Sequence, residues 1–341
     1  MSGTVVAFGE LMLRLGPPGF ERLLQSPMLC ATFGGGEANV AVSLAQFGLE
    51  SYYVTRLPSN AIGDAAVRAL RAEGVRTDYI VRGGSRMGIY FTETGASQRA
   101  STVLYDRANS AISDIPADAL DWDRVMKGAS WFHVTGITPA LGAKTTAATQ
   151  AAVTAAKRAG ARISVDLNYR KKLWTQAQAQ QTMRPLMRDV DVVIANEEDL
   201  QCVLGIDVEG ADVTSGSLNV DAYRAAAQRV TSELGPSMVA ITLRESLSAS
   251  DNGWSAVLWD GKTMHQSQHY NVRLVDRIGG GDSFAGGLIY GLVTGRSHAD
   301  ALRFGVAASA LKQTIPGDFN RASVGEVDAL AAGDASGRVQ R

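Results

Sequence analysis

The sequence contains little cysteine: it has Cys30 and Cys202 among 341 residues, and neither belongs to a Cys-x-x-Cys pair. Two cysteines are too few for a disulfide framework or a four-cysteine zinc site. The sequence also lacks any apolar run close to the roughly 20 residues that span a bilayer, and no basic leader precedes its first apolar stretch. These absences predict a cytoplasmic protein that has no membrane partner.

Neither sign of charge dominates the sequence. It has 33 lysines and arginines against 34 aspartates and glutamates, which gives a formal net charge of −1. No stretch gathers the roughly five or six basic residues that would neutralise a run of nucleic-acid phosphates, so we expect no nucleic-acid partner. The four histidines show no metal-ligand spacing, and we expect each of them to have a packing or surface role.

What the sequence does contain is typical of a globular α/β protein. Hydrophobic residues make up 45% and charged residues 20%, and we expect residues 1–341 to form a single domain. Strands are predicted at residues 4–8, 52–55, 131–134, 163–167, 190–195 and 238–242, and helices at 37–47, 60–73, 145–158, 220–234, 282–294 and 297–313. This alternation predicts a mostly parallel sheet with helices on both faces.

Two short alternating segments interrupt this rhythm. Residues 88–93 and 99–105 are separated by a turn that contains Gly95 and Ala96. The pattern predicts an antiparallel hairpin that stands apart from the main sheet. A second hairpin is predicted around Asp260 and Gly261.

Residues 276–287, Asp-Arg-Ile-Gly-Gly-Gly-Asp-Ser-Phe-Ala-Gly-Gly, carry the clearest chemical signal. Gly279, Gly280 and Gly281 allow a tight turn whose amide groups point inward, and the helix that follows adds the positive end of its dipole. Such a segment can hold an anion. Asp282 at its mouth could remove the proton of an attacking hydroxyl while the amides stabilise a transferring phosphoryl group. The alternative is a tight helix entry in which Asp282 is only a capping residue.

Other nucleotide-binding motifs are absent from the sequence. A Walker loop needs a glycine five residues before Gly261, where the sequence has Ala256. No Gly-x-Gly-x-x-Gly motif follows the first predicted strand. The sequence therefore disfavours a P-loop ATPase and a dinucleotide-dependent oxidoreductase.

Residues 276–287 and residues 34–39, Gly-Gly-Gly-Glu-Ala-Asn, resemble the C-terminal and N-terminal signatures of the ribokinase-like (PfkB) carbohydrate kinases. Asp166, residues 196–199 and residues 242–245 also fall at predicted strand ends where that family places its nucleotide and metal contacts. The resemblance covers nearly the whole chain and has its two signatures in the right order. It implies a sugar kinase with a ribokinase-like α/β core and with ATP and Mg²⁺ as cofactors.

The same resemblance implies a small β-sheet lid. The lid is expected to form from inserted segments at about residues 11–33 and 86–107, the second of which contains the predicted hairpin. A lid excludes water, because a phosphoryl donor beside bulk water would lose its γ-phosphate to hydrolysis. Lids of this family often pair, so a homo-oligomer formed through the lid is also expected.

Within the family, the closest resemblance is to 2-keto-3-deoxygluconate kinases. It rests on Gly-Ile-Thr-Pro-Ala-Leu at 136–141, Asp-Leu-Asn-Tyr-Arg at 166–170 and Tyr-Asp-Arg at 105–107, and it implies ATP-dependent phosphorylation of the terminal hydroxyl of that sugar acid. The forked side chains of Arg107 and Arg170 match a carboxylate, although each could instead form a surface ion pair or contact ATP. The alternatives are family members that phosphorylate fructose, ribose, a nucleoside or 5-keto-2-deoxygluconate, and a sensor without catalysis.

The resemblance also assigns roles to individual residues. Substrate contacts are expected from Gly35, Asn39, Tyr90, Tyr105, Arg107, Arg170, Asp282 and Asp318, and ATP contacts from Asn168, Thr242, Arg244, Gly279 and Gly281. Catalysis is assigned to Asp282 together with the amides of residues 279–281. Tyr90 and Tyr105 could equally be packing residues, and Asp318 could be a simple turn residue.

One departure from the family pattern concerns the metal. The family commonly has Asn-x-x-Glu near the phosphates, whereas residues 196–199 here are Asn-Glu-Glu-Asp, with a shorter carboxylate in the fourth position. A magnesium ion that bridges ATP phosphates needs oxygen ligands, or waters held by carboxylates. The sequence leaves its ligands open, with Asn196, Glu198 and Asp199 as candidates.

Overall fold

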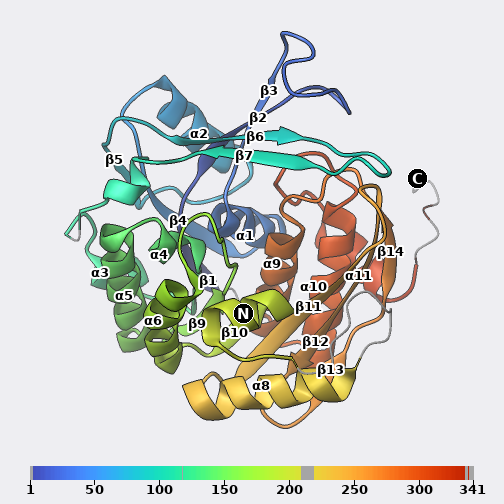
Figure 1. The fold of residues 1–341 in the computed structure, drawn as a ribbon. Coiled ribbons are helices and arrows are strands. Elements are labelled where there is room, and N and C mark those ends of the chain that lie inside the picture. The colour runs from blue at the N-terminus through green and yellow to red at the C-terminus, as the bar shows by residue number, and fades with distance from the viewer. Residues whose placement is uncertain (1–2, 117, 209–218, 335–336, 338–341) are drawn as a thin grey trace.

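The computed structural model describes residues 3–116, 118–208, 219–334 and 337, and the largest element within them is a mostly parallel sheet (Figure 1). Its strands are β1 (Thr4–Phe8), β4 (Glu50–Leu57), β5 (Ile80–Arg82), β8 (Trp131–Thr135), β9 (Arg162–Asp166), β10 (Val192–Ala195), β11 (Met238–Ser246), β12 (Asp251–Trp259), β13 (Met264–Gln266) and β14 (Tyr270–Arg273). Their order is β13-β12-β11-β10-β9-β8-β1-β4-β5, with β14 also paired to β12. Strands from β11 to β5 are parallel, and β12 is antiparallel to its neighbours.

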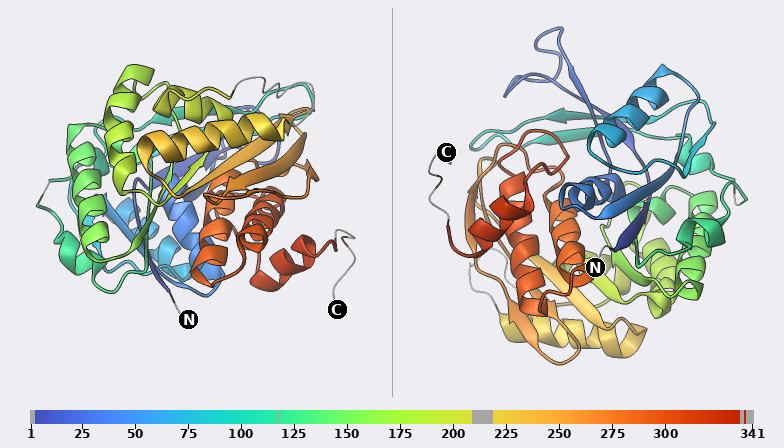
Figure 2. Two further views of the ribbon diagram at one scale, coloured as in Figure 1. Left: turned by 90° about the horizontal axis from the view of Figure 1, so that it is seen from below. Right: turned by 180° about the vertical axis from the view of Figure 1, so that it is seen from behind.

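Helices cover both faces of this sheet (Figure 2). They are α1 (Gly36–Gln46), α2 (Ala61–Ala72), α3 (Trp122–Met126), α4 (Ile137–Ala140), α5 (Ala143–Arg158), α6 (Gln176–Leu186), α7 (Glu197–Asp199), α8 (Val220–Leu234), α9 (Gly280–Val293), α10 (His298–Lys312) and α11 (Val324–Ala331). Val6 and Phe8 of β1 pack in a cluster with α3, α5, α6 and α8, whereas Val5 packs with α1, α9 and α10. Both faces of a central parallel strand are therefore buried, which explains its continuous apolar sequence.

The predicted mostly parallel sheet is confirmed, and so are the predicted helices, with small differences at their ends. Helix α8 has the predicted bounds because Asn219 accepts a hydrogen bond from the amide of Ala222 at its start, and Gly235 ends it with φ of 103°. Strand β11 extends past its predicted end to Ser246, because β12 pairs with it as far as that residue. In the described part of the chain, no helix combines the length and apolar character needed to cross a membrane.

A separate four-stranded sheet, referred to below as the small sheet, has the order β3-β2-β6-β7. It consists of β2 (Met12–Gly16), β3 (Cys30–Gly34), β6 (Gly88–Glu93) and β7 (Thr102–Asp106). Strands β6 and β7 form the predicted antiparallel hairpin, although β7 begins later than predicted because Ala96 and Arg99 close the turn with two backbone hydrogen bonds. Strand β2 is parallel to β6, with Met12 opposite Gly88, a pairing that no local sequence pattern signals.

Candidate active site

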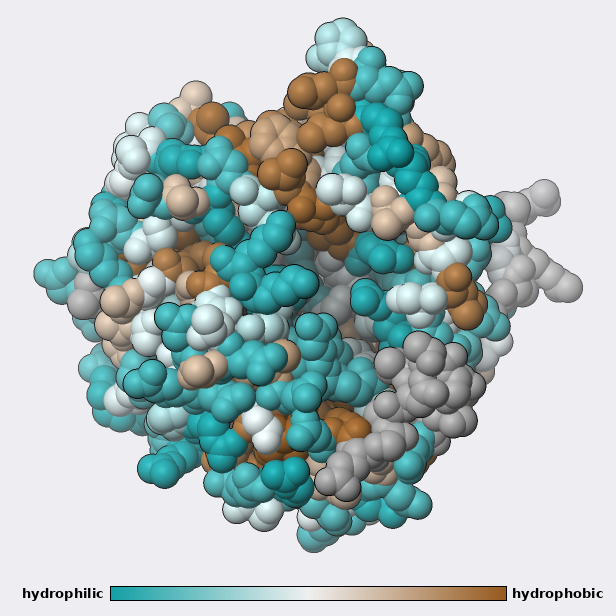
Figure 3. All heavy atoms as spheres, viewed as in Figure 1, coloured by the Kyte–Doolittle hydropathy of each residue, from teal (hydrophilic) through white to brown (hydrophobic). Residues whose placement is uncertain are grey.

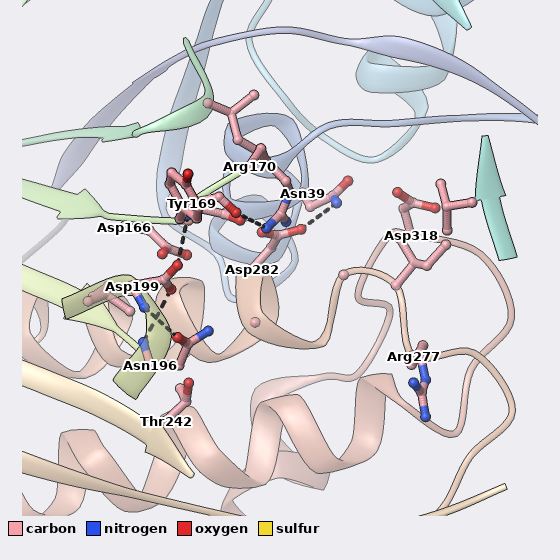
Figure 4. Close-up of a pocket in the computed structure, with 18 of the residues that line it drawn as sticks. Asn39, Asp166, Tyr169, Arg170, Asn196, Asp199, Thr242, Arg277, Asp282 and Asp318 are labelled. Atoms are coloured by element: carbon pink, nitrogen blue, oxygen red, sulfur yellow. Dashed lines mark hydrogen bonds between the residues drawn. The ribbon is translucent and has the colours of Figure 1, made fainter. Parts of the chain in front are cut away.

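A pocket of about 870 Å³ lies between the small sheet, the carboxyl ends of β9, β10 and β11, and the beginning of α9 (Figure 4). Open α/β sheets commonly bind ligands outside the carboxyl ends of their strands. The sequence-predicted residues that line it are Gly35, Asn39, Tyr90, Tyr105, Arg107, Asn168, Arg170, Asn196, Glu198, Asp199, Thr242, Arg244, Gly279, Gly281, Asp282 and Asp318. The structure thus brings together residues from both ends of the chain.

Gly280 does not line the pocket. Its amide donates to the carbonyl of Arg277 at 3.3 Å, and its carbonyl accepts from Ser309 Oγ at 2.7 Å. A Cβ added to Gly280 would meet the side chain of Gln313, so this glycine faces the protein interior. The structure therefore corrects the expectation that the amide of Gly280 faces an anion together with its neighbours.

The other two glycines shape an anion cradle at the start of α9. Gly279 has φ of +82°, and a Cβ there would lie 2.1 Å from the carbonyl oxygen of Asp318, so only glycine fits. Within the described residues, no backbone carbonyl accepts from the amides of Gly281 or Asp282. These free amides and the positive end of the helix dipole favour a negatively charged group.

Asp282 lies at the bottom of the pocket, held by the first turn of α1. Asn39 Nδ2 donates to Asp282 Oδ2 at 2.6 Å, and Asn39 Oδ1 in turn accepts from the amide of Gly35 at 3.3 Å (Figure 4). Burial raises the pKa of Asp282 to about 7, against the opposing hydrogen bond from Asn39. A carboxylate that gains and loses a proton near neutral pH, and whose position is fixed by an amide, suits a general base.

Gly281→Ala tests the cradle without disturbing the fold. A Cβ at Gly281 meets no atom within 4 Å, so the methyl group would project into the pocket. We expect the kcat/KM measured with ATP to fall roughly 10- to 100-fold, while the free energy of unfolding rises by up to about 1 kcal/mol, since alanine favours the helix. Gly325→Ala is the matched control, because Gly325 is also the second residue of a helix with open space around it. Equal activity in both variants would contradict the cradle.

Arg14 on β2 ties the small sheet to the rest of the protein. Its Nη1 lies 2.6 Å from Asp318 Oδ1, its Nη2 lies 2.5 Å from Asp276 Oδ2, and all three side chains are at most 10% exposed. Tyr90 on β6 donates to the other oxygen of Asp318 at 2.6 Å. Asp318 is therefore more than a turn residue. The sequence analysis missed Arg14, although a charged residue between Leu13 and Leu15 in a short apolar segment was an available signal.

Lys312 is a second buried cation that the sequence analysis missed. The residue is fully buried, and its Nζ donates to the carbonyl of Asp276 at 3.1 Å. Burial lowers the pKa of Lys312, and the carboxylates of Asp276 and Asp318 oppose that shift. A Cβ on Gly279 would lie 3.2 Å from Lys312 Cε, so this ammonium group lies directly behind the anion cradle. A lysine that follows the segment Val306–Leu311, in which only Ser309 is polar, is its sequence signal.

Arg107 and Arg170 differ in how they are held. Arg107 donates through both Nε and Nη2 to Glu10 Oε2, the first of these bonds at 2.8 Å, and its guanidinium lies over the ring of Tyr105 at 5.0 Å. The Nε–Nη2 edge of the Arg107 guanidinium is therefore already bound to Glu10. Arg170 is exposed, and none of the carboxylates in the described ranges pairs with it; its Nη1 donates to the carbonyl of Tyr169 at 2.9 Å. Arg170 is thus the freer of the two to meet an anionic ligand.

Arg244 and Arg277 form a basic pair on the β11 side of the pocket. Both line it, and neither forms an ion pair with a carboxylate among the described residues. Burial, followed by the nearby charge of Arg244, lowers the pKa of Arg277, and Arg277 Nε is buried without a described partner. Two adjacent cations without acidic partners match the oxygens of phosphate groups.

Carboxylates gather where β9 and β10 end, and they fit a divalent cation. Both carboxylate oxygens of Asp199 already accept backbone hydrogen bonds. Oδ1 accepts from the amide of Tyr169 at 2.8 Å, and Oδ2 accepts from the amide of Asn196 in a capping box. Burial, with Asp199 and Asp282 nearby, raises the pKa of Asp166 well above its ordinary value, and no donor among the described residues reaches its carboxylate. Mg²⁺ would relieve this repulsion, so Asp166 and Glu198 fit it better than Asp199 does.

Residues 3–320 match the pfkB family of carbohydrate kinases. The chain belongs to this family. A 2-dehydro-3-deoxygalactonokinase of Haloferax volcanii is 32% identical over 98% of this chain and 99% of its own length, and a 2-dehydro-3-deoxygluconokinase of Bacillus subtilis is 28% identical over 92% and 91%. The crystal structure of a 2-dehydro-3-deoxygluconokinase from Thermotoga maritima is 51% identical, covers 97% of this chain and 100% of its own, and has a TM-score of 0.94.

Membership in the pfkB family confirms the resemblance seen in the two glycine signatures, the ribokinase-like fold and the sugar-kinase class. The fold extends to more distant proteins: a ribokinase II of E. coli, solved in complex with ATP and Mg²⁺, is 20% identical and has a TM-score of 0.79.

Proposed function

We propose that this pfkB kinase transfers the γ-phosphoryl group of ATP to the terminal hydroxyl of 2-keto-3-deoxygluconate, also named 2-dehydro-3-deoxygluconate, and forms its 6-phosphate. The observation that carries the proposal is the position of Asp282, whose carboxylate bonds Asn39 on one side and adjoins the free amides of α9 on the other. A hydroxyl that enters from the Asn39 side meets its base and the phosphoryl group in one place. Relatives that act on 2-dehydro-3-deoxy sugar acids support the choice of substrate.

In this mechanism Asp282 takes the proton of the terminal hydroxyl as that oxygen attacks the γ-phosphorus in line. The amides of Gly281 and Asp282 stabilise the charge that spreads over the transferring group, because they are already oriented and need no rearrangement. Arg244 and Arg277 neutralise the phosphates on the β11 side. A bound Mg²⁺ ion, held by Asp166 and Glu198 directly or through water, would add positive charge to the ATP phosphates.

The small sheet acts as a lid in this proposal. Tyr90 and Arg107 reach the pocket from β6 and from the end of β7, and the ion pairs of Arg14 hold the sheet against the core. A covered pocket protects the phosphoryl donor from hydrolysis and strengthens the electrostatic contacts inside it. The segments that form the sheet, 12–34 and 88–106, lie within or beside those that the sequence predicts for a lid.

Arg170→Ala tests recognition of the sugar carboxylate. Because Arg170 has no carboxylate partner among the described residues, its removal costs the protein little stability. We expect the KM for 2-keto-3-deoxygluconate to rise roughly 10- to 100-fold, the loss of one charge-assisted contact, while the KM for ATP changes less than twofold. Lys172→Ala, an exposed neighbour outside the pocket, is the control. A rise confined to the KM for ATP would instead assign Arg170 to the phosphates.

The substrate proposal is tested by ADP release from Mg·ATP against a panel of acceptors: 2-keto-3-deoxygluconate, its galactonate epimer, 5-keto-2-deoxygluconate, fructose, ribose and adenosine. We expect the highest kcat/KM for the 2-keto-3-deoxy acids. Preference for a neutral sugar would retain the kinase and reject the substrate, whereas no turnover of any acceptor would favour a sensor. The Asp282→Asn variant, run in parallel, separates true turnover from background ATPase activity.

We also propose that the small sheets of two copies pair to form a homodimer. Apolar side chains gather over this sheet (Figure 3), where Phe20, Leu24, Met28 and Leu104 are 53–73% exposed. Such a patch on a soluble enzyme is typical of an interface. Light scattering after size-exclusion chromatography should give a dimer for the wild type and a monomer for Leu24→Glu/Leu104→Glu. Ile62→Glu, exposed on α2, should leave the dimer intact; a monomeric wild type would reject the proposal.

The cytoplasm is the compartment we propose. Cys30 is exposed and Cys202 is buried, and both are free thiols. Free thiols persist in a reducing compartment, which is also where ATP is available.

A further inference from the structure

Three residues that the kinase mechanism does not use meet at the end of the sheet opposite the pocket. Strand β12 begins beside the pocket, where it pairs with Glu245 and Ser246, and ends just before Asp260. Asp260 lies in the turn after β12, His265 lies in β13 and His298 is the first residue of α10, so three separate segments each contribute one side chain. The sequence spacing of these residues gave no sign of a common site.

The polar atoms of these residues converge. Asp260 Oδ2 lies 2.7 Å from His265 Nε2 and 3.0 Å from His298 Nδ1, and all three atoms lie within 4.8 Å of one another. Metal bonds to imidazole nitrogen and carboxylate oxygen are about 2.0–2.2 Å long, which places ligand atoms roughly 3.3 Å apart in a tetrahedron. Asp260 Oδ2 therefore needs to move only about 0.3–0.6 Å away from the two imidazole nitrogens, which lie no more than 4.8 Å from each other, to admit an ion.

The carboxylate is held in position for such a role. Asp260 Oδ1 accepts from the amides of Lys262 at 2.9 Å and Thr263 at 2.7 Å, so Oδ2 is left facing the two imidazoles. Although burial alone would raise it, the pKa of Asp260 is held below its usual range by the hydrogen bonds from His265 and His298. Hydrogen bonds that orient a ligating carboxylate are a regular feature of metal centres.

We propose that Asp260, His265 and His298 form a site for a divalent transition metal, for which Zn²⁺ is the best match. Two imidazoles and one carboxylate leave a fourth tetrahedral position for water or an external ligand. Binding requires each metal-facing ring nitrogen to carry no proton, which a neutral imidazole achieves by holding its proton on the other ring nitrogen. The ion links the β12–β13 turn to the first residue of α10, the helix whose far end carries Lys312 behind the anion cradle.

The site is tested on chelator-treated, full-length protein with ZnCl₂ in isothermal titration calorimetry, and with Co²⁺ in visible absorption. We expect the wild type to bind one more Zn²⁺ per chain than His265→Gln/His298→Gln, whose amides keep hydrogen-bonding capacity without the imidazole ligands. Tetrahedral Co²⁺ absorption should appear in the wild type and be absent from the double variant. Zn²⁺ should also raise the melting temperature of the wild type more than that of the variant.

Two controls keep the result interpretable. His269→Gln removes a histidine that faces a single carboxylate, Glu245 at 3.4 Å, and should bind as much Zn²⁺ as the wild type. Melting of each variant in chelator shows that it is folded before titration. Equal Zn²⁺ stoichiometry and equal Co²⁺ absorption in the wild type and the double variant would overturn the proposal and leave the cluster as a hydrogen-bonded contact alone.

Discussion

Asp282→Asn is expected to lower kcat by about 10²- to 10⁴-fold, the usual contribution of a positioned general base. Asparagine keeps the size of the side chain and can still bond Asn39, so the KM values for ATP and the sugar acid should change little. The measurement is steady-state ADP release, with binding of both substrates followed by calorimetry. A kcat within tenfold of the wild type would remove the general-base role from Asp282.

The pH dependence gives an independent test of the same residue. Since the pKa of Asp282 is about 7 in the structure, the unprotonated base predominates above that pH and is lost below it. The kcat/KM of the wild type should therefore rise with pH through about 7 and then level off. The residual kcat/KM of Asp282→Asn should not rise with pH in this range. The same rise in both proteins would assign the titrating group to a residue other than Asp282.

The stability of Asp282→Asn separates lost chemistry from lost structure. The folded-state pKa of Asp282 is raised, so between the unfolded-state pKa and about 7 the folded protein binds the proton more tightly than the unfolded chain. The free energy of unfolding therefore decreases as pH rises through this window. Asparagine carries no charge and avoids that loss, so at pH 8 the variant should melt at a higher temperature than the wild type. A lower melting temperature would indicate damage to the fold.

Arg14→Leu is expected to be the most destabilising of the substitutions considered for the small sheet. Removing one partner of a buried ion pair leaves an uncompensated charge, and here both Asp276 and Asp318 lose theirs; such changes cost about 3–5 kcal/mol. Asp318 would also hold Tyr90 less firmly, so the KM for the sugar acid should rise. Urea unfolding measures the first effect and steady-state kinetics the second.

Arg22→Leu is the matched control for this change. Arg22 also belongs to the small-sheet region and pairs with a carboxylate, Glu93 at 2.9 Å, but its side chain is 64% exposed. A solvent-exposed pair contributes about 0–1 kcal/mol, so Arg22→Leu should change the free energy of unfolding by no more than that. If the two substitutions cost the same, burial of the Arg14 pairs is not what stabilises the sheet.

The fold was predictable from sequence where local patterns determine it. Strand β1 is apolar from Val5 to Phe8 because both of its faces are buried there, and Asn219 and Gly235 mark the ends of α8. Helix α6 was not predicted, because its glutamine-rich sequence has only three buried apolar residues, Ala179, Met183 and Leu186, and includes Pro185. Strands β2 and β3 were not predicted individually either, since β2 is stabilised by parallel pairing with β6, far along the chain.

The residues of the candidate site also fall into two groups, those that local sequence patterns reveal and those that only contacts between distant segments bring into place. Glycine-rich segments and residues at strand ends are visible in sequence because they follow one another closely, and the structure places them around one pocket. A charge within or beside an apolar segment marks Arg14 and Lys312, but their partners, and the pairing of Glu10 with Arg107, depend on contacts between distant segments that no local pattern reveals. The cluster of Asp260, His265 and His298 was hidden for the same reason, because its members come together only when β12, β13 and α10 are packed.

The connections to the small sheet carry a kinetic consequence. The chain enters or leaves this sheet between β1 and β2, between β3 and α1, before β6 and after β7, and Glu10, Gly35 and Arg107 lie at three of these crossings. Any outward swing of the sheet must therefore displace residues that line the sugar side of the pocket, while Thr242 and Gly281 stay on the core. In the lid mechanism proposed above, ATP would dock on either form of the enzyme, whereas capture of the sugar acid and closure would become one event. Under that proposal, release of the phosphorylated product would require the sheet to swing outward again, and turnover would be no faster than that movement.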